Sequence, residues 1–198
     1  MRKFFLTISI FLGALLLVGL GTGVGLYLWV IKDLPRVETI SDYNPPLTTT
    51  VYTRNDNVLG YLAREKRFLR SLSDMADVVP RCFLAAEDHG FYQHEGIDLM
   101  GILRAALKNI KAGSIVQGGS TITQQVIKAL LLTPERSYER KLKEAILAYR
   151  LERNLDKDEI LTIYLNEIYL GHRAYGVEAA SRVYFGKHVD QLTLAEAS

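Results

Sequence analysis

The stretch Ala85–Asp98, AAEDHGFYQHEGID, brings acids, aromatic rings and histidines together in one short segment. An apolar run that begins at Cys82 leads into two adjacent acids, Glu87 and Asp88, and then into a His-Gly turn. A carboxylate at the edge of an apolar core loses hydration, which raises its pKa and suits it to act as a general acid or base near neutral pH. The alternative is a helix that ends in two solvated acids, because most acidic side chains are exposed.

Composition indicates one ordinary domain around this stretch. The chain has 198 residues, of which 48% are hydrophobic, and a formal net charge of +2. This near-neutral charge argues against a nucleic-acid-binding protein, which would carry a concentrated basic excess. Cys82 is the only cysteine, which excludes an internal disulfide and a multi-cysteine metal site.

The N-terminal segment has the composition of a membrane anchor. Phe4–Ile31 contains no charged residue, and as a helix it would be about 40 Å long, enough to cross a hydrocarbon core of about 30 Å. We predict a transmembrane signal anchor over residues 4–31 behind a cytoplasmic tail of residues 1–3. Basic residues in the tail favour this orientation, although Lys32 and Arg36 leave a thin margin. A cleaved signal peptide fits less well, because the apolar run is about twice the usual length.

Residues 32–70 predict a linker followed by a β-hairpin. Three prolines between Lys32 and Leu47 favour an extended chain. Thr48–Thr53 contains β-branched and aromatic residues, Val58–Leu62 resumes an apolar pattern, and the Asn-Asp-Asn sequence between them favours a turn.

Residues 71–198 predict a mostly helical domain. Asp98 is a candidate N-cap for a helix that ends near Gly113. Its apolar residues recur at helical spacing: Leu99, Leu103, Ala106 and Ile110. A basic stripe borders them: Arg104, Lys108 and Lys111. Such a helix can lie on an anionic membrane surface, or it can cover the core as an ordinary amphipathic helix.

A glycine-rich turn precedes the next predicted helix. Gly118 and Gly119 are followed by a capping box of Thr121 with Gln124. Free amide groups at such a helix N-terminus suit an anion such as phosphate, and Lys128 lies one turn further on. A plain linker before a capped helix would explain the turn equally well.

A second carboxylate lies on a helix that begins near Ser137. Glu144 is one turn after Arg140 and Lys141, which places both cations beside it. Leu147 and Leu151 continue the same face, so we expect Glu144 to be shielded from solvent. The alternative is an ordinary surface pair at i,i+4 spacing.

Three further helix signals follow. Asp156 with Glu159 begins a helix that runs to Leu170, and another helix is predicted over Ala174–Phe185. Thr193–Glu196 is a capping box that begins a helix two residues before the chain stops, so we expect the sequence to be a fragment.

Five motifs together resemble the glycosyltransferase (transglycosylase) domain of class A penicillin-binding proteins and monofunctional peptidoglycan glycosyltransferases, glycosyltransferase family 51. They are EDHGFYQHEGID from Glu87, GGSTITQQ from Gly118, RKLKEAILAYRLE from Arg140, ILTIYLNEIYLG from Ile160 and AYGVEAASRVYFGK from Ala174.

This resemblance implies a mostly α, lysozyme-like helical domain with a small N-terminal β-hairpin, preceded by one transmembrane helix. It implies polymerisation of lipid II into β-1,4 glycan strands, by inversion at the donor anomeric carbon and with release of undecaprenyl pyrophosphate. The domain would face the outside of the bacterial cytoplasmic (inner) membrane. The implied partners are lipid II, the growing glycan chain, the membrane, and proteins of cell division or elongation. A divalent cation (Mg or Mn) near Glu144 is the implied cofactor, with no organic cofactor.

By matching positions, Glu87 would be the general base that deprotonates the acceptor 4-hydroxyl. Glu144 would be the second catalytic carboxylate, acting near the donor pyrophosphate through a metal ion or the neighbouring cations. The residues that match positions shaping or binding the sugar-pyrophosphate site are Asp88, Phe91, His94, Thr121, Gln125, Lys128, Arg136, Arg140 and Lys141.

Two other functions are compatible with parts of the sequence. A lysozyme-like muramidase or lytic transglycosylase also uses one glutamate to protonate a glycosidic oxygen. The cations around Glu144 argue against it, because a neutral glycan has no pyrophosphate to hold. A single-pass scaffold would treat the acids and cations as solvated faces.

Overall fold

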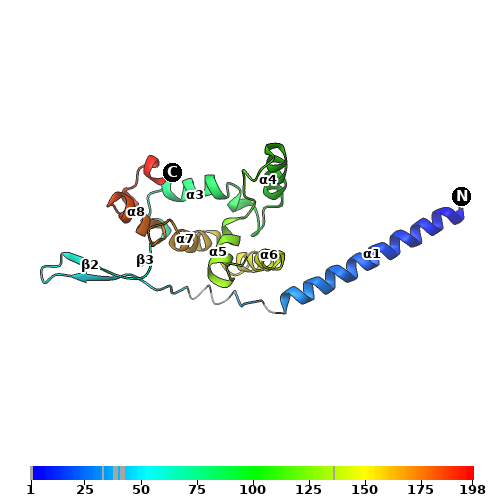
Figure 1. The fold of residues 1–198 in the computed structure, drawn as a ribbon, viewed down its shortest axis with the longest axis horizontal. Coiled ribbons are helices and arrows are strands. Elements are labelled where there is room, and N and C mark those ends of the chain that lie inside the picture. Colours follow the sequence, from blue (N-terminus) through cyan, green and yellow to red (C-terminus); the bar gives the residue numbers. More distant parts are fainter. Residues whose placement is uncertain (1, 33, 38–39, 41–42, 136) are drawn as a thin grey trace.

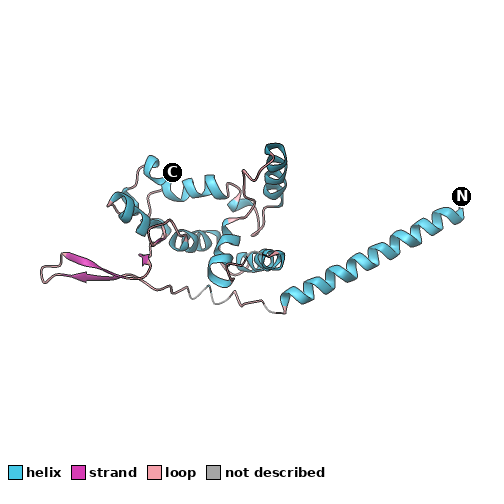
Figure 2. Ribbon diagram, in the orientation of Figure 1, coloured by secondary structure: helices cyan, strands magenta, loops and turns pink. Residues whose placement is uncertain are grey.

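The computed structural model describes residues 2–32, 34–37, 40, 43–135 and 137–198, and it joins one long helix to a mostly helical domain (Figures 1 and 2). The long helix is α1 (Arg2–Ile31), as the uncharged run predicts. Its segment Ile10–Ile31 has a mean hydropathy of 2.1 and is long and apolar enough to cross a membrane. Most side chains of α1 are exposed, but Val30 near its end is buried where α1 contacts α6.

The β-hairpin is confirmed. Strand β1 (Thr49–Tyr52) pairs antiparallel with β2 (Val58–Leu62), and Thr49 lies opposite Leu62. The hairpin projects from the domain on the side opposite α1 (Figure 1). It therefore stands clear of the elements that form the core.

The segment between α1 and the hairpin packs against the domain. Val37 and Ile40 are buried in the hydrophobic core, and the Tyr43 hydroxyl donates a 2.6 Å hydrogen bond to Glu167. Burial and this bond raise the pKa of Tyr43. The extended linker predicted here is found only over residues 43–48, because turn hydrogen bonds join the Ile40 amide to the Val37 carbonyl and the Tyr43 amide to the Ile40 carbonyl. The apolar residues of this segment are part of the fold.

The helices of the domain begin close to most of the predicted signals, although the helix predicted to run to Leu170 ends at Glu167. They are α3 (Val78–Glu87), α4 (Leu99–Ala112), α5 (Ile122–Leu131), α6 (Tyr138–Glu152), α7 (Lys157–Glu167), α8 (Val177–Phe185) and α9 (Leu194–Ala197), with 3₁₀ turns η1 (Leu72–Asp74), η2 (Phe91–Gln93) and η3 (Val189–Gln191). Asp98 caps α4, and complete capping boxes begin α5, α7 and α9. Gly113 ends α4 in the left-handed conformation.

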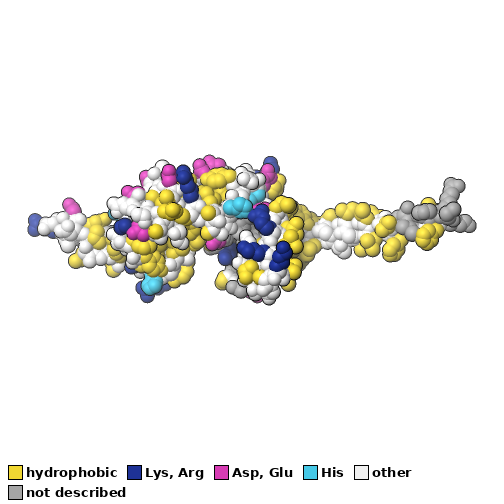
Figure 3. Space-filling view, turned by 90° about the horizontal axis from the view of Figure 1, so that it is seen from above, with side chains coloured by type: hydrophobic (Ala, Val, Ile, Leu, Met, Phe, Trp, Pro, Cys, Tyr) yellow, Lys and Arg dark blue, Asp and Glu magenta, His cyan; other side chains and the backbone are white. Residues whose placement is uncertain are grey.

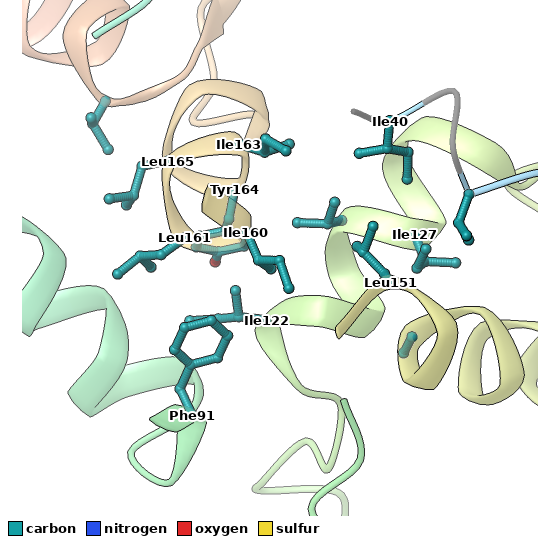
Figure 4. Close-up of a cluster of buried hydrophobic side chains, with 14 of the residues drawn as sticks. Ile40, Phe91, Ile122, Ile127, Leu151, Ile160, Leu161, Ile163, Tyr164 and Leu165 are labelled. Carbon is teal, nitrogen blue, oxygen red and sulfur yellow. The ribbon is translucent and has the colours of Figure 1, made fainter. Parts of the chain in front are cut away.

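The core lies where α5, α6 and α7 meet. Figure 4 shows Phe91 beside Ile122, beneath Tyr164 of α7, and places Leu151 of α6 near Ile127. Ile40 enters this cluster from the segment after α1. The elements that carry the predicted site residues are thus held by one shared hydrophobic cluster.

The predicted helix over Ala174–Phe185 is wrong at its start. Ala174–Tyr175 forms strand β4, which pairs in parallel with β3 (Lys66–Arg67), and α8 begins only at Val177. Gly176 separates the two at φ +80°, with its Cα packed so closely that a Cβ there would lie 2.7 Å from the Asn166 carbonyl oxygen. The distant pairing with β3 overrides the local helical pattern.

The apolar face of α4 does not cover the core. Leu99 is 73% exposed and Ile110 is 76% exposed, and Ala105 is the one residue of α4 that is buried. The interpretation of α4 as an ordinary helix over the core is therefore wrong. Figure 1 shows α4 on the same side of the domain as α1.

Glu178 joins the two ends of the domain through a buried network. Its carboxylate, which is 1% exposed as a residue, accepts hydrogen bonds from Arg70, Arg182 and the Val189 amide, and it contacts His188 at 2.8 Å. Burial alone would raise its pKa, but these donors outweigh burial and lower the pKa to about 2. The folded state therefore favours the ionised carboxylate.

This network predicts acid sensitivity. An acid whose pKa is depressed in the folded state contributes stability above its unfolded pKa, and that contribution is lost as the pH falls from about 4.5 to about 2. For Glu178 it amounts to about 3 kcal/mol. We expect Glu178→Gln to unfold at lower urea concentration at pH 7 and to lose less stability on acidification than the wild type. An equal loss on acidification in both proteins would contradict the prediction.

Candidate active site

A buried carboxylate joins the end of α3 to the start of α5. Asp88, the residue after α3, accepts a 3.0 Å hydrogen bond from the Ile122 amide at the first position of α5. His94 Nε2 lies 3.0 and 3.1 Å from the two oxygens of Asp88, so this ring nitrogen carries the proton that the bond requires. The buried Asp88 side chain thus holds the end of α3 against the start of α5, and His94 is bonded to the same carboxylate.

The turn after His94 is fixed against α5 and α6. Thr121, the N-cap of α5, is buried and donates a 2.7 Å hydrogen bond to the Gly96 carbonyl. Gly96 has φ +84°, and a Cβ at this position would lie 2.7 Å from the Ala148 carbonyl carbon. A side chain at this turn would push α6 away from α5.

Gly96→Ala should therefore destabilise the domain by about 2–4 kcal/mol, through backbone strain and the clash with α6. Gly113→Ala is the matched control, because Gly113 also has positive φ (+64°) but a Cβ there has nothing within 4 Å. The control should cost only about 1 kcal/mol. Thermal unfolding of the full chain in detergent measures both, and equal losses would show that the contact with α6 does not matter.

Glu87 is the last residue of α3 and remains exposed. It accepts a 2.9 Å hydrogen bond from Gln125 Nε2 on α5. It also lines a mainly apolar groove of about 690 Å³ between α3, α8 and α9. The helix end is as predicted, but the expected loss of hydration is not observed, because the neighbouring Ala85 and Ala86 are exposed as well. Of the two acids, it is Asp88 that is buried.

Glu144 lies on α6 between two cations. It is only 2% exposed, its Oε2 is 2.6 Å from Lys141 Nζ, and its Oε1 accepts a hydrogen bond from Arg140. Lys141 Nζ also donates to Ser120 in the loop before α5, at 2.9 Å. The prediction that Glu144 is shielded is confirmed, and the surface-pair alternative is wrong. This cluster supplies net positive charge beside the N-terminus of α5.

The predicted divalent ion remains a prediction. Both oxygens of Glu144 are paired with cations, so a metal ion would have to displace Arg140 or Lys141. Within the residues that the structure describes, no group of three or more His, Cys, Asp or Glu side chains is placed to hold a metal.

The other predicted site residues differ in how deeply they are buried. Phe91 is fully buried beneath the start of α5, so it can shape the site without reaching its surface. Lys128 on α5 is exposed and makes no hydrogen bond or ion pair with a described residue. Arg136 lies outside the described residues.

Three neighbours of the site were not predicted. Ser120 holds Lys141, and Arg104 of α4 lies 3.1 Å from His89 Nε2. Tyr164 lies in the core near Glu87, with a hydroxyl that makes no hydrogen bond to any described group, and burial together with the charge of Glu87 raises its pKa. Ser120 belongs to the glycine-rich motif, so the sequence contained a signal for it. The position of Tyr164 in the sequence does not distinguish it from any other apolar residue of a helix.

Comparison of the sequence with protein families identifies a known class. The family model described as Transglycosylase matches residues 55–198, so the chain belongs to the transglycosylase family. The resemblance based on the five motifs is thereby confirmed.

Several proteins with sequences similar to this chain are penicillin-binding proteins. The chain is 49% identical over 178 residues to penicillin-binding protein 1A of Aquifex aeolicus (strain VF5), covering 88% of this chain and 24% of that protein. It is 43% identical over 194 residues to penicillin-binding protein 1A of Escherichia coli (strain K12), covering 98% of this chain and 22% of that protein. Penicillin-binding protein 1A of Neisseria flavescens is 43% identical over 180 residues, covering 89% and 23%. The chain thus spans about a quarter of the length of these relatives.

Proposed function

We propose that this chain carries the catalytic centre of a peptidoglycan glycosyltransferase that joins lipid II units into β-1,4 glycan strands. The observation that carries the proposal is the placement of two unlike carboxylates on either side of the α5 N-terminus. Glu87 is exposed and bonded to one amide, whereas Glu144 is buried between two cations. The environments of the two acids therefore differ, as we expect if the two carboxylates have different roles.

Glu87 suits the role of general base. Its carboxylate is open to an incoming hydroxyl and is oriented by the hydrogen bond from Gln125. Attack by the acceptor 4-hydroxyl on the donor anomeric carbon forms the new glycosidic bond, breaks the bond to the pyrophosphate oxygen, and passes the hydroxyl proton to Glu87. A single displacement of this kind inverts the anomeric configuration.

The opposite side of the site suits a leaving pyrophosphate. Arg140 and Lys141 are aligned by Glu144, and Lys128 adds an exposed positive charge on α5. Preorganised cations stabilise the negative charge that develops on the departing oxygen. A glycan hydrolase has no such group to stabilise, so this cluster favours transfer from lipid pyrophosphate over cleavage of finished peptidoglycan.

Incubation of the detergent-solubilised chain with labelled lipid II tests the proposal. Wild type should produce glycan polymer on a resolving gel, and Glu87→Gln should lose about 10²–10⁴ in rate, because a positioned base contributes that much. Asp77→Asn is the control, since Asp77 forms an exposed ion pair with Arg81 at the end of α3 opposite Glu87. Soluble fragments released from finished peptidoglycan, without consumption of lipid II, would refute the proposal.

Glu144→Gln probes the cationic side separately. The substitution leaves Arg140 and Lys141 without the anion that aligns them, and we expect the polymerisation rate to fall by about 10²–10³. Circular dichroism must show that the variant is folded, because breaking a buried ion pair also destabilises. A folded variant with full activity would remove Glu144 from the mechanism.

We also propose a lysozyme-like domain held on the outer face of the bacterial cytoplasmic membrane by α1. The exposed apolar residues of α4 support this placement, because helix α4 lies on the same side of the domain as α1 (Figure 1). Figure 3 shows Lys and Arg side chains next to hydrophobic ones on this part of the surface. An apolar face bordered by cations suits the interface of an anionic bilayer.

The triple variant Arg104→Glu, Lys108→Glu, Lys111→Glu tests the role of α4. In nanodiscs containing phosphatidylglycerol, the amides of wild-type α4 should be protected from hydrogen exchange, and the variant should lose this protection through charge repulsion. Arg54→Glu in the hairpin turn is the control. If wild-type α4 exchanges equally fast in these nanodiscs and in a short-chain detergent without anionic charge, the helix does not contact the bilayer.

A further inference from the structure

A groove lies where the chain leaves α1 and meets the end of α6. It has a volume of about 810 Å³, within the range of about 300–1,000 Å³ typical of ligand sites. Its walls come from the segment after α1 and from the C-terminal end of α6: Leu34, Pro35, Arg36, Val37, Arg150, Arg153 and Asn154. Val30, one turn earlier, is buried at the contact between α1 and α6, so the groove is held in place.

The groove is basic. Among its described lining residues three are arginines and none is acidic. Arg153 donates a 3.2 Å hydrogen bond to the Tyr149 hydroxyl and lies over its ring, which leaves other donors of its guanidinium available. Arg150 makes no side-chain hydrogen bond or ion pair with any described residue. Asp33 and Glu38 flank this segment in the sequence and lie outside the described residues.

The groove lies at the level of lipid headgroups if α1 spans the membrane. Helix α1 ends at Ile31, and Tyr27 and Trp29 in its last turns are residue types that favour the membrane interface. Residues 34–37 follow directly, so they lie just outside the hydrocarbon region, where phosphate groups are found. The exposed apolar surface of α1 below them can accompany acyl chains.

We propose that this groove binds the phosphodiester headgroup of an anionic phospholipid. The guanidinium groups of Arg150 and Arg153 match phosphate oxygens in fork geometry, while the partly exposed Leu34 and Pro35 cover the glycerol backbone. A phosphatidylcholine headgroup would place its own cation among the arginines and bind less well. The site is separate from the catalytic cluster, because Arg150 is six residues, about 9 Å along the helix axis, beyond Glu144. It depends on α1 as a membrane span and is independent of the proposed chemistry.

Native mass spectrometry of the full chain in detergent tests the site. Titration with phosphatidylglycerol should give a saturable adduct of one lipid, and titration with phosphatidylcholine should not. Each arginine near an anionic surface contributes about a five-fold change in binding. The double variant Arg150→Gln, Arg153→Gln should therefore weaken the adduct by about 10–30-fold. Polymerisation of lipid II by both proteins, measured in parallel, reports on the catalytic proposal independently.

The matched control removes the same charge elsewhere. Arg54→Gln with Arg64→Gln neutralises two exposed arginines at the hairpin, on the side opposite α1, and should leave the adduct unchanged. Equal losses of the lipid adduct in both double variants would show that only the net charge of the protein matters, and would overturn the proposed site. Equal retention of phosphatidylcholine, or competition by glycerol 1-phosphate at the concentration of the lipid, would also overturn it. Unfolding temperatures of the variants establish that they are folded.

Discussion

The hydrogen bonds of one buried carboxylate determine the geometry of the whole site. Asp88 accepts the Ile122 amide and the His94 ring, and so fixes the end of α3 against the start of α5. Glu87 is the neighbour of Asp88, and Gln125 is one turn into α5, so their 2.9 Å hydrogen bond follows from that junction. Burying a carboxylate without hydrogen-bond partners is very costly. The hydrogen bonds that stabilise the fold at Asp88 therefore also position Glu87.

The two sides of the site are tuned by opposite means. In the proposed mechanism, Glu87 keeps the access to solvent that a general base needs if a hydroxyl is to reach it. Glu144 is withdrawn from solvent, which strengthens its hold on Arg140 and Lys141 in a medium of lower dielectric constant. The α5 N-terminus lies between them, and its Ile122 and Gln124 amides already donate to Asp88 and to the Thr121 hydroxyl. The cations are thus the main anion-binding groups that the site offers.

Local signals predicted much of this structure. The caps at Asp98, Thr121 and Asp156, the hairpin and the burial of Glu144 follow from short-range patterns, and the structure confirms them. Features that depend on distant segments were not predictable in this way. Strand β4 exists because β3 lies beside it, and the exposure of Glu87 depends on how α8 and α9 approach α3. Periodicity showed that α4 is amphipathic, but it cannot say what covers the apolar face.

The buried segment after α1 has a consequence for how the domain meets its surroundings. Val37 and Ile40 belong to the core, and Tyr43 is bonded to Glu167 of α7, so the anchor is built into the domain instead of hanging from it. If α1 spans the membrane as proposed, a domain mounted in this way would keep one face toward the bilayer and one height above it. Reactants confined to the same membrane would then approach by lateral diffusion and in a preset orientation, so that encounter would take place in two dimensions with little rotational search. Lengthening this segment would change that encounter without altering a single side chain of the proposed site.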